Sequence, residues 1–302
     1  MLNCFSCMNK LTIQFFTCVL FYFTLVNSTN AQQEPIITQF WNAQNYFNPA
    51  TAGVKLKHEA AFIARNQWAK LNNNPLSQLA SYAVRLKKIH GGIGVNYVHE
   101  TIGFSKINKL KFIYAYHLKL KNEGIISFGL SAGVKIFNYK PEWVQPVLPS
   151  DPAVAVAFTD SKLTTDFGLV YSKNRTTIGI SATQLNAPRF SGNSSLTFQD
   201  VRHYYAFANH TFGKEDKLQF TPQVLYQTDL NFNSLDVNLL ISYKSSYYIG
   251  ITYRNRDAIA GIVGYDIRKK YRISFSYDVT QSKLNNGVSG GSYELVLGCR
   301  LK

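Results

Sequence analysis

Long segments in which apolar and polar residues alternate run from about residue 57 to the end of the chain. In Tyr271–Val279, for example, the odd positions are Tyr, Ile, Phe, Tyr and Val, and the even positions are Arg, Ser, Ser and Asp. A period of two identifies a β-strand whose two faces meet different environments. The pattern predicts about fourteen strands. They span residues 57–66, 76–86, 90–99, 108–120, 124–137, 163–173, 175–185, 201–212, 217–228, 234–244, 246–254, 257–267, 270–280 and 291–301.

The length of these segments narrows the choice of architecture. Most are about 9–13 residues long, whereas strands of ordinary globular proteins have a mode of about 5–6 residues. A tilted strand that crosses a membrane needs about 9–11 residues. Soluble β-sandwiches and propellers also alternate, so the alternation alone leaves both classes open. The strand length favours a membrane barrel.

The connections between the segments alternate in length along the chain. They are short after even-numbered segments, as in "KKI", "KNE" and "RK", and several are long after odd-numbered segments, up to residues 138–162. Short turns on one rim and longer loops on the other are typical of bacterial outer-membrane barrels. We therefore predict an all-β chain whose residues 57–302 form a transmembrane antiparallel β-barrel of about fourteen strands. Its apolar rows face lipid, and its first and last strands meet the periplasmic rim.

The composition agrees with a location in the cell outer membrane. Charged residues make up 16% of the 302 residues, against about 25% in a typical soluble domain. The net charge of +15 suits anionic partners such as outer-membrane lipid and lipopolysaccharide. The basic residues are dispersed along the chain, so no nucleic-acid binding is predicted.

A signal peptide is predicted over residues 1–31. Lys10 precedes the apolar run "LTIQFFTCVLFYFTLV", and Thr29 and Ala31 follow at plausible cleavage positions. This run is shorter than the roughly 20 residues that a spanning helix needs. Removal of the signal would leave Cys299 as the single cysteine, so no internal disulfide is expected.

Residues 32–56 are predicted to form an N-terminal periplasmic or barrel-plugging segment. The stretch is too polar for a strand, yet it carries four aromatic residues within residues 40–47. Large apolar surfaces are costly to leave in water. The segment therefore either packs inside its own barrel or offers aromatic anchors to a secretion component. The candidate partner-binding residues are Phe40, Trp41, Tyr46, Phe47, Asn48 and Pro49, with Trp143 in the proline-rich connection 138–162.

Charged residues on the polar faces of the strands are predicted to face the lumen. They either line a pore or form a salt-bridged interior, and the mixing of acids with bases favours the salt-bridged interior. Pairing of Arg272 with Glu294 or with Asp278 would be ordinary structural chemistry for such an interior. The candidate lumen-facing residues are Lys111, His117, Asp236, Arg272, Asp278, Glu294 and Arg300.

No catalytic constellation is recognisable in the sequence. It contains no GxSxG, HExxH, Walker A or CxxC motif, and its six histidines lack the spacing of metal ligands. We therefore expect neither an enzyme nor a protein that carries a cofactor or a metal ion.

Several motifs, in order, resemble the PorP/SprF family of outer-membrane proteins of the Bacteroidetes type IX secretion system. They include "EPIITQFWNAQNYFNPATAG" (residues 34–53), "RNQW" (65–68), "GIGVNYVHETIGFS" (92–105) and "SYDVTQSKL" (276–284). The resemblance covers nearly the whole chain after the signal. It implies a barrel that binds or anchors an adhesin-like surface protein with a C-terminal type IX sorting domain. It also implies a link to periplasmic components of the secretion or gliding machinery. The alternative function is a passive diffusion channel.

Overall fold

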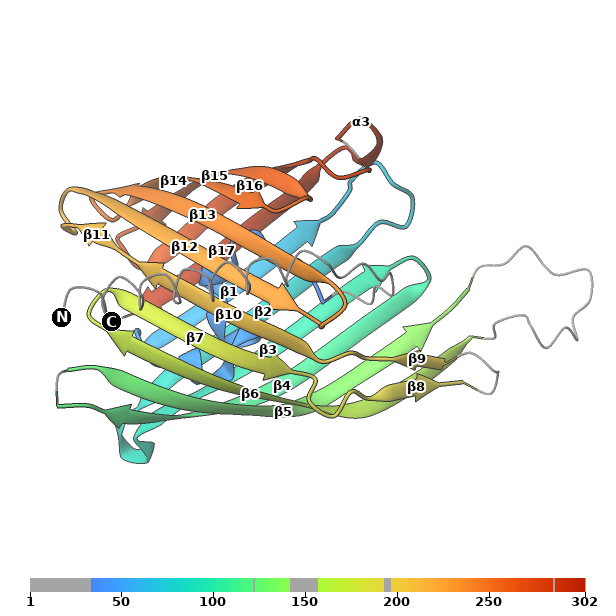
Figure 1. Cartoon of the computed structure of the whole chain (residues 1–302), viewed down its shortest axis with the longest axis horizontal. Helices are drawn as coiled ribbons and strands as arrows, with labels where there is room; N and C mark the ends of the chain where they lie inside the picture. Colours follow the sequence, from blue (N-terminus) through green and yellow to red (C-terminus); the bar gives the residue numbers. More distant parts are fainter. Residues whose placement is uncertain (1–33, 122, 142–156, 193–196, 285, 302) are drawn as a thin grey trace, which may run out of the picture.

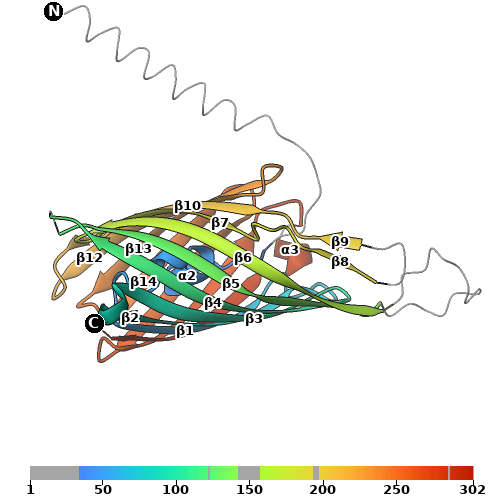
Figure 2. The same ribbon diagram turned by 90° about the horizontal axis from the view of Figure 1, so that it is seen from below.

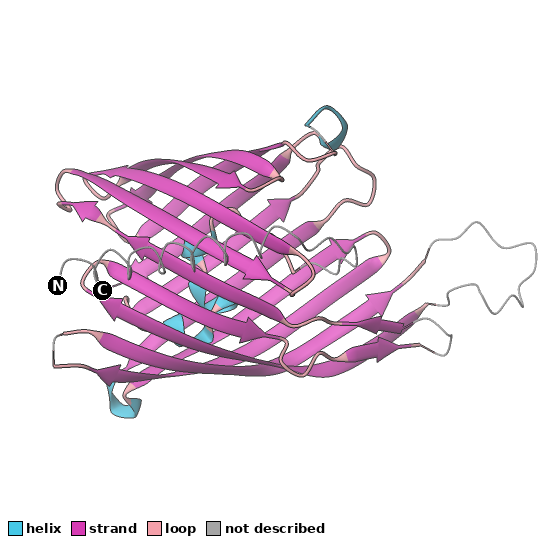
Figure 3. Cartoon of the chain, viewed as in Figure 1, coloured by secondary structure: helices cyan, strands magenta, loops and turns pink. Residues whose placement is uncertain are grey.

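A closed antiparallel β-barrel forms the body of the molecule (Figures 1 and 3). The computed structural model describes residues 34–301 except 122, 142–156, 193–196 and 285. The strands are β1 (His58–Asn66), β2 (Leu76–Leu86), β3 (Gly91–Ile102), β4 (Ser105–Lys119), β5 (Ile125–Tyr139), β6 (Phe158–Lys173), β7 (Thr176–Thr183), β8 (Arg189–Ser191), β9 (Thr197–Gln199), β10 (His203–His210), β11 (Phe212–Gly213), β12 (Leu218–Thr228), β13 (Asn233–Tyr243), β14 (Tyr247–Arg254), β15 (Ala258–Ile267), β16 (Tyr271–Thr280) and β17 (Ser292–Leu301).

Two strand pairings close the wall. β1 pairs with β17, which joins the first and last strands, and β10 pairs with β12. The two-residue β11 follows β10 and also pairs with β12, so β10 and β11 together act as one strand of the wall. The 15 strands of this sheet therefore make a barrel of fourteen, as the sequence predicted. β8 and β9 form a separate two-stranded sheet.

The helical elements of the described residues are short. They are η1 (Phe40–Asn42), α2 (Gln44–Phe47), η2 (Pro49–Thr51), η3 (Lys87–Ile89) and α3 (Asn286–Ser289). None of the helices in the described part of the chain is long and apolar enough to cross a membrane. The first three lie inside the barrel, and Figure 2 shows α2 enclosed by strands.

The two faces of the wall separate as the alternation predicted. On β16, Tyr271, Ile273 and Phe275 are exposed on the outside, at 53%, 45% and 42% of their full accessible surface. Arg272 and Asp278, on the other face of the same strand, are buried. A continuous belt of exposed aromatic and aliphatic side chains in water would cost a great deal of free energy, whereas in a bilayer it contacts hydrocarbon.

Arginine on this outer face is expected to destabilise the barrel according to its depth in the bilayer. Phe275→Arg, at the middle of β16, should cost about 2–4 kcal/mol, and Tyr271→Arg, at the end of the same face, about 0–1 kcal/mol. Unfolding of both variants by urea from lipid vesicles measures the difference. Equal losses would mean that this face does not lie against the hydrocarbon of a membrane.

The rims differ as the turn lengths predicted, with one change in detail. β1 begins and β17 ends at the same rim, where His58 lies opposite Leu301. We call this the inner rim, and the opposite end the outer rim. The connection that the sequence suggested after residue 99 is only a two-residue turn, because β3 and β4 pair as far as Ile102 and Ser105. The long connection between β5 and β6 lies largely outside the described residues.

Accessibility to a membrane-impermeant thiol reagent tests this orientation. In a Cys299→Ser background, Asn231→Cys on the outer rim should react on intact cells. Asp216→Cys on the inner rim should react only after the outer membrane is permeabilised. Both side chains are exposed, so burial does not explain a difference. The reverse labelling would invert the assigned orientation.

Candidate functional site: a plugged lumen and an inner cavity

The N-terminal segment fills the middle of the lumen. We call residues 34–54 the plug. Phe40, Tyr46 and Phe47 of the plug are each at most 5% exposed. They form one hydrophobic cluster with wall residues that include Ile63, Leu79, Val98, Tyr205, Phe207, Leu225 and Val296. A fully buried aromatic side chain contributes about 1.5–3 kcal/mol, so the cluster is a main source of the plug's attachment.

The "NPATAG" stretch fits the plug against one side of the wall. Asn48 Oδ1 accepts a hydrogen bond from Ala50 N at 2.9 Å, which caps η2, while Asn48 Nδ2 donates to Ile180 O at 2.9 Å on the wall. Gly129 and Gly168 permit this close approach. A Cβ at Gly129 would lie 2.1 Å from Ala50 N, and one at Gly168 would lie 2.0 Å from Asn48 Oδ1.

A buried ionic network holds the other side of the plug, and we call it the latch. The Glu294 carboxylate accepts hydrogen bonds from the backbone N–H groups of Thr38 and Gln39, both at 2.8 Å. Arg65 bridges Glu294 at 3.2 Å and Asp278 at 2.7 Å. Hydrogen bonds that involve charged groups are the strong ones in proteins. The latch comprises Thr38 and Gln39 of the plug and Arg65, Asp236, Arg254, Asp278 and Glu294 of the wall.

Arg272 forms neither of the two pairs considered above. Arg272 binds Asp266 at 2.7 Å, whereas Glu294 and Asp278 bind Arg65. The strand register explains the difference. Asp266 lies directly opposite Arg272 on β15 and β16, and Arg65 lies directly opposite Glu294 on β1 and β17.

Further ion pairs fill the outer half of the lumen. Lys109 binds Glu34 of the plug at 2.5 Å, and Lys111 binds Asp166 at 2.8 Å. Burial by itself would raise the pKa of Glu34, but the positive charges of Lys109 and its neighbours hold that pKa well below its usual range. Glu34 is therefore a carboxylate that accepts a hydrogen bond from the Tyr46 hydroxyl. Burial, followed by the Glu34 charge, raises the pKa of Tyr46 well above its usual value.

The structure places the predicted lumen residues inside the barrel. Lys111, His117, Asp236, Arg272, Asp278 and Glu294 are all buried, and Arg300 is partly exposed to the cavity described below. His117 lies with its Nε2 3.0 Å from Ala52 O of the plug. Sequence reasoning missed six members of these pairs: Glu34, Arg65, Lys109, Asp166, Arg254 and Asp266. All of them except Glu34, which belongs to the plug, lie on the inward face of their strands, and this alternation is a signal that could have found them.

The predicted partner-binding residues have mixed positions. Phe40, Tyr46, Phe47, Asn48 and Pro49 are buried inside the barrel. Trp41 is partly buried and lines a cavity at the inner end. Trp143 lies outside the described residues. The aromatic residues of the plug thus pack against their own barrel, which favours plugging over docking for this segment.

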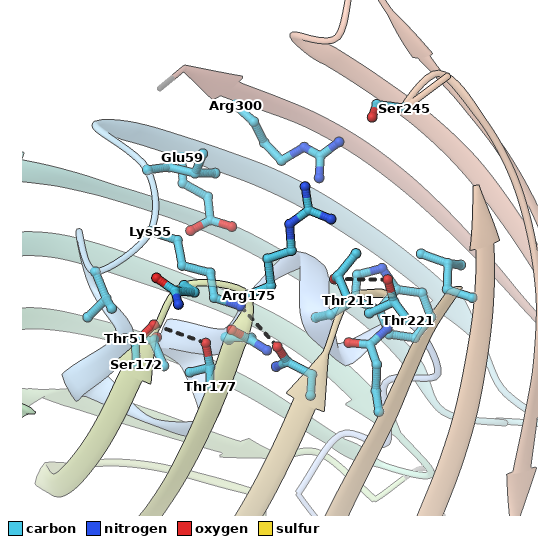
Figure 4. A pocket seen from close by; sticks show the side chains of 18 of the residues that line it. Thr51, Lys55, Glu59, Ser172, Arg175, Thr177, Thr211, Thr221, Ser245 and Arg300 are labelled. Carbon is cyan, nitrogen blue, oxygen red and sulfur yellow. Dashed lines mark hydrogen bonds between the residues drawn. The ribbon is translucent and has the colours of Figure 1, made fainter. Parts of the chain in front are cut away.

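An inner cavity of about 650 Å³ lies between the plug and the inner rim (Figure 4). Plug residues such as Trp41 and Thr51 line it on one side, and inner-rim residues such as Arg175 and Ser245 line it on the other. Lys55, which follows the plug, donates to Asn209 Oδ1 at 2.9 Å. Enclosure by the barrel lowers the pKa of Lys55 to about 8, and the charge of Glu59 opposes this shift.

The described residues contain no group of three or more His, Cys, Asp or Glu side chains that could hold a metal ion. The basic side chains of the latch, together with Lys109 and Lys111, instead form ion pairs with carboxylates of the wall or the plug. Their arrangement can hold a polypeptide segment in place.

The fold and the plugged lumen define an outer-membrane β-barrel whose own N-terminal segment occupies its interior. The barrel is similar to the Ralstonia pickettii toluene transporter TbuX, with a TM-score of 0.50, 13% identity, and coverage of 84% of this chain and 92% of that one. It is also similar to the CymD monoaromatic hydrocarbon channel (TM-score 0.49, 13% identity, 89% and 93% coverage) and to a Pseudomonas aeruginosa FadL homologue (0.48, 10%, 91% and 100%). Identities this low show a shared fold alone.

The family of the chain follows from its sequence. Residues 29–299 match the type IX secretion system membrane protein family PorP/SprF, and the chain belongs to that family. No curated protein matches the chain.

Proposed function

We propose that this barrel binds a secreted adhesin-like protein with a C-terminal type IX sorting domain and anchors it at the cell surface. In this proposal the barrel also connects that cargo to periplasmic components of the secretion or gliding machinery. Membership of the type IX secretion family supports the setting. The observation that carries the proposal is the plug, because a barrel with a filled lumen offers its two ends, rather than a pore, for function.

The way in which the plug is held supports a permanent occupant of the lumen. Its aromatic side chains belong to the hydrophobic cluster of the wall, and its backbone N–H groups bind Glu294. On its other side, Ser127 Oγ donates to Ala50 O at 2.6 Å, and Ser181 Oγ donates to Phe47 O at 2.7 Å. A segment bonded to the wall on several sides has no simple path out of the lumen.

A passive diffusion channel is the second candidate function. The polar inner cavity favours it, because hydroxyl, amide and charged side chains would line a water-filled entrance. The two functions differ in one measurable property. The anchoring function requires no ion flow through the intact barrel, whereas the channel function requires steady conductance in a planar bilayer.

We also propose that the barrel acts by binding, without catalysis or a cofactor of its own. Around the plug, the charged side chains of Arg65, Lys109 and Lys111 are occupied by ion pairs with carboxylates of the wall or the plug. A reaction would need at least one group free to exchange protons or to attack a substrate.

Recovery of partners from the solubilised outer membrane tests the anchoring function. An affinity-tagged barrel should retain an exported protein with a type IX sorting domain, and an unrelated outer-membrane barrel with the same tag should not. Deletion of the barrel should move that protein from the cell surface to the culture medium. If no exported protein is retained and the set of surface proteins stays unchanged, the anchoring function is wrong.

A further inference from the structure

The inner cavity has the features of a binding site that the anchoring function does not use. It lies at the inner rim, opposite the end that faces a surface protein. Plug residues close it toward the middle of the lumen, so a ligand enters through the inner rim. Its volume of about 650 Å³ falls within the range of about 300–1,000 Å³ for ligand cavities. A single small anion would leave most of this space unfilled.

The charge of the lining is positive. Six Lys or Arg residues and four Asp or Glu residues line the cavity, an excess of two positive charges. The acids Glu59, Glu123, Glu215 and Asp266 face the bases Lys55, Arg85, Arg175, Lys269, Arg272 and Arg300. A cavity with low-dielectric walls and an excess of one sign attracts ligands of the other sign.

Four of these bases form no ion pair with a carboxylate among the described residues: Lys55, Arg85, Arg175 and Lys269. The guanidinium of Arg85 donates to the backbone carbonyls of Gly53 and Val54 in the plug. Lys55 donates to the amide oxygen of Asn209, and Arg175 donates to the backbone carbonyl of Gly213. By contrast, Arg272 and Arg300 both bind the carboxylate of Asp266. Figure 4 shows Lys55 and Arg175 beside the same space. An ammonium and a guanidinium that share a space can receive one carboxylate through charge-assisted hydrogen bonds.

Neutral polar groups complete the site. Hydroxyl groups surround the space, and these can bond the N–H and C=O groups of an extended peptide. They belong to Thr51, Ser172, Thr177, Thr211, Thr221 and Ser245 (Figure 4).

We propose that the inner cavity binds a carboxylate-bearing polypeptide tail from the periplasm, with Lys55 and Arg175 receiving the carboxylate. The hydroxyl-rich lining bonds the peptide backbone, and Trp41 at the plug forms the end of the site. The carboxylate comes either from the chain end or from an Asp or Glu side chain near it. This site is separate from the surface anchoring proposed above, and either one can fail without the other.

Three labelled probes test this proposal on the purified full-length barrel in detergent. The first is a fluorescent Gly/Ser pentapeptide with a free carboxyl end. The second is the same peptide with an amidated end, and the third is the amidated peptide with one internal aspartate. Fluorescence anisotropy should show binding of the first or third probe at least about tenfold tighter than binding of the second, as expected for a charge-assisted hydrogen bond. Comparison of the first with the third identifies the source of the carboxylate.

Matched variants connect the binding to the two bases. Lys55→Gln and Arg175→Gln should each weaken the preferred probe about tenfold, since each removes one charged donor. Lys244→Gln, in the neighbouring inner turn but outside the cavity lining, should leave the affinity unchanged. Each variant should keep the melting temperature of the unmodified protein. The proposal would be overturned if the amidated peptide without aspartate bound as tightly as the other two probes. It would also be overturned if both cavity variants kept the affinity of the unmodified protein.

Discussion

Deletion of residues 34–47 is expected to turn a closed barrel into a conducting one. A barrel of eight strands is filled by its own side chains, and barrels of about 16–18 strands leave an aqueous channel. Fourteen strands leave a space between these limits, and here the plug occupies it. Without residues 34–47, Leu79, Val98 and Leu225 lose the plug aromatics Phe40, Tyr46 and Phe47, which belong to the same hydrophobic cluster. In planar bilayers the deletion variant should show stepwise ion conductance, and its melting temperature should fall.

A point substitution tests whether the barrel opens when the plug is displaced but still present. Gly129→Val places a side chain where Ala50 N now lies 2.1 Å from the position of a Cβ. It should therefore push the plug away from the wall and cause intermittent conductance. Gly261→Val is the matched control, because a Cβ at Gly261 meets no atom within 4 Å. If the deletion variant stays closed and melts at the temperature of the intact protein, the plug neither seals nor stabilises the barrel.

Much of the barrel could be predicted because its pattern is local. Alternation along one strand already assigns Tyr271, Ile273 and Phe275 to the outside and Arg272 to the inside. The count of strands and the parity of the turns follow from the same pattern. The small β8–β9 sheet was missed because its three-residue strands are too short to show a period.

The partners inside the lumen could not be predicted in the same way. Arg65 and Glu294 are 229 residues apart in the sequence and meet only because β1 closes the barrel against β17. A shift of register by two residues would preserve every apolar face yet change the partners in the ion pairs that join neighbouring strands. The helical turns of the plug are likewise held by tertiary contacts, such as those of Asn48 with the wall. Short helical turns have no stable form in water by themselves.

Removal of Glu294 should be the most damaging single change to the latch. Glu294 is fully buried, and its carboxylate binds Arg65 together with the backbone N–H groups of Thr38 and Gln39. Glu294→Ala removes one of the two carboxylates that bind the buried Arg65 guanidinium. It also leaves the buried N–H groups of Thr38 and Gln39 without their acceptor. Breaking a buried ion pair by removing one partner costs about 3–5 kcal/mol. Urea unfolding from lipid vesicles should show a loss of this size.

An exposed ion pair provides the control. Lys162 lies 3.1 Å from Asp160, but its side chain is 41% exposed, so Lys162→Ala should cost at most about 1 kcal/mol. Limited proteolysis gives a second readout, because Glu294→Ala should expose the plug to a protease and Lys162→Ala should not. A loss below about 1 kcal/mol for Glu294→Ala, with a protected plug, would show that the latch does not hold it.

The double variant Arg65→Met with Glu294→Met tests why the latch is ionic. Replacement of a buried ion pair by apolar residues of similar volume is often neutral for stability. Here the backbone N–H groups of Thr38 and Gln39 would still lack their acceptor, and Asp278 would lose its 2.7 Å contact with Arg65. We therefore expect the double variant to recover only part of the stability that Glu294→Ala loses, and its plug to stay sensitive to protease. If both the stability and the protease resistance recovered in full, the Arg65–Glu294 pair would make no contribution to holding the plug. The aromatic cluster would then be sufficient to retain it.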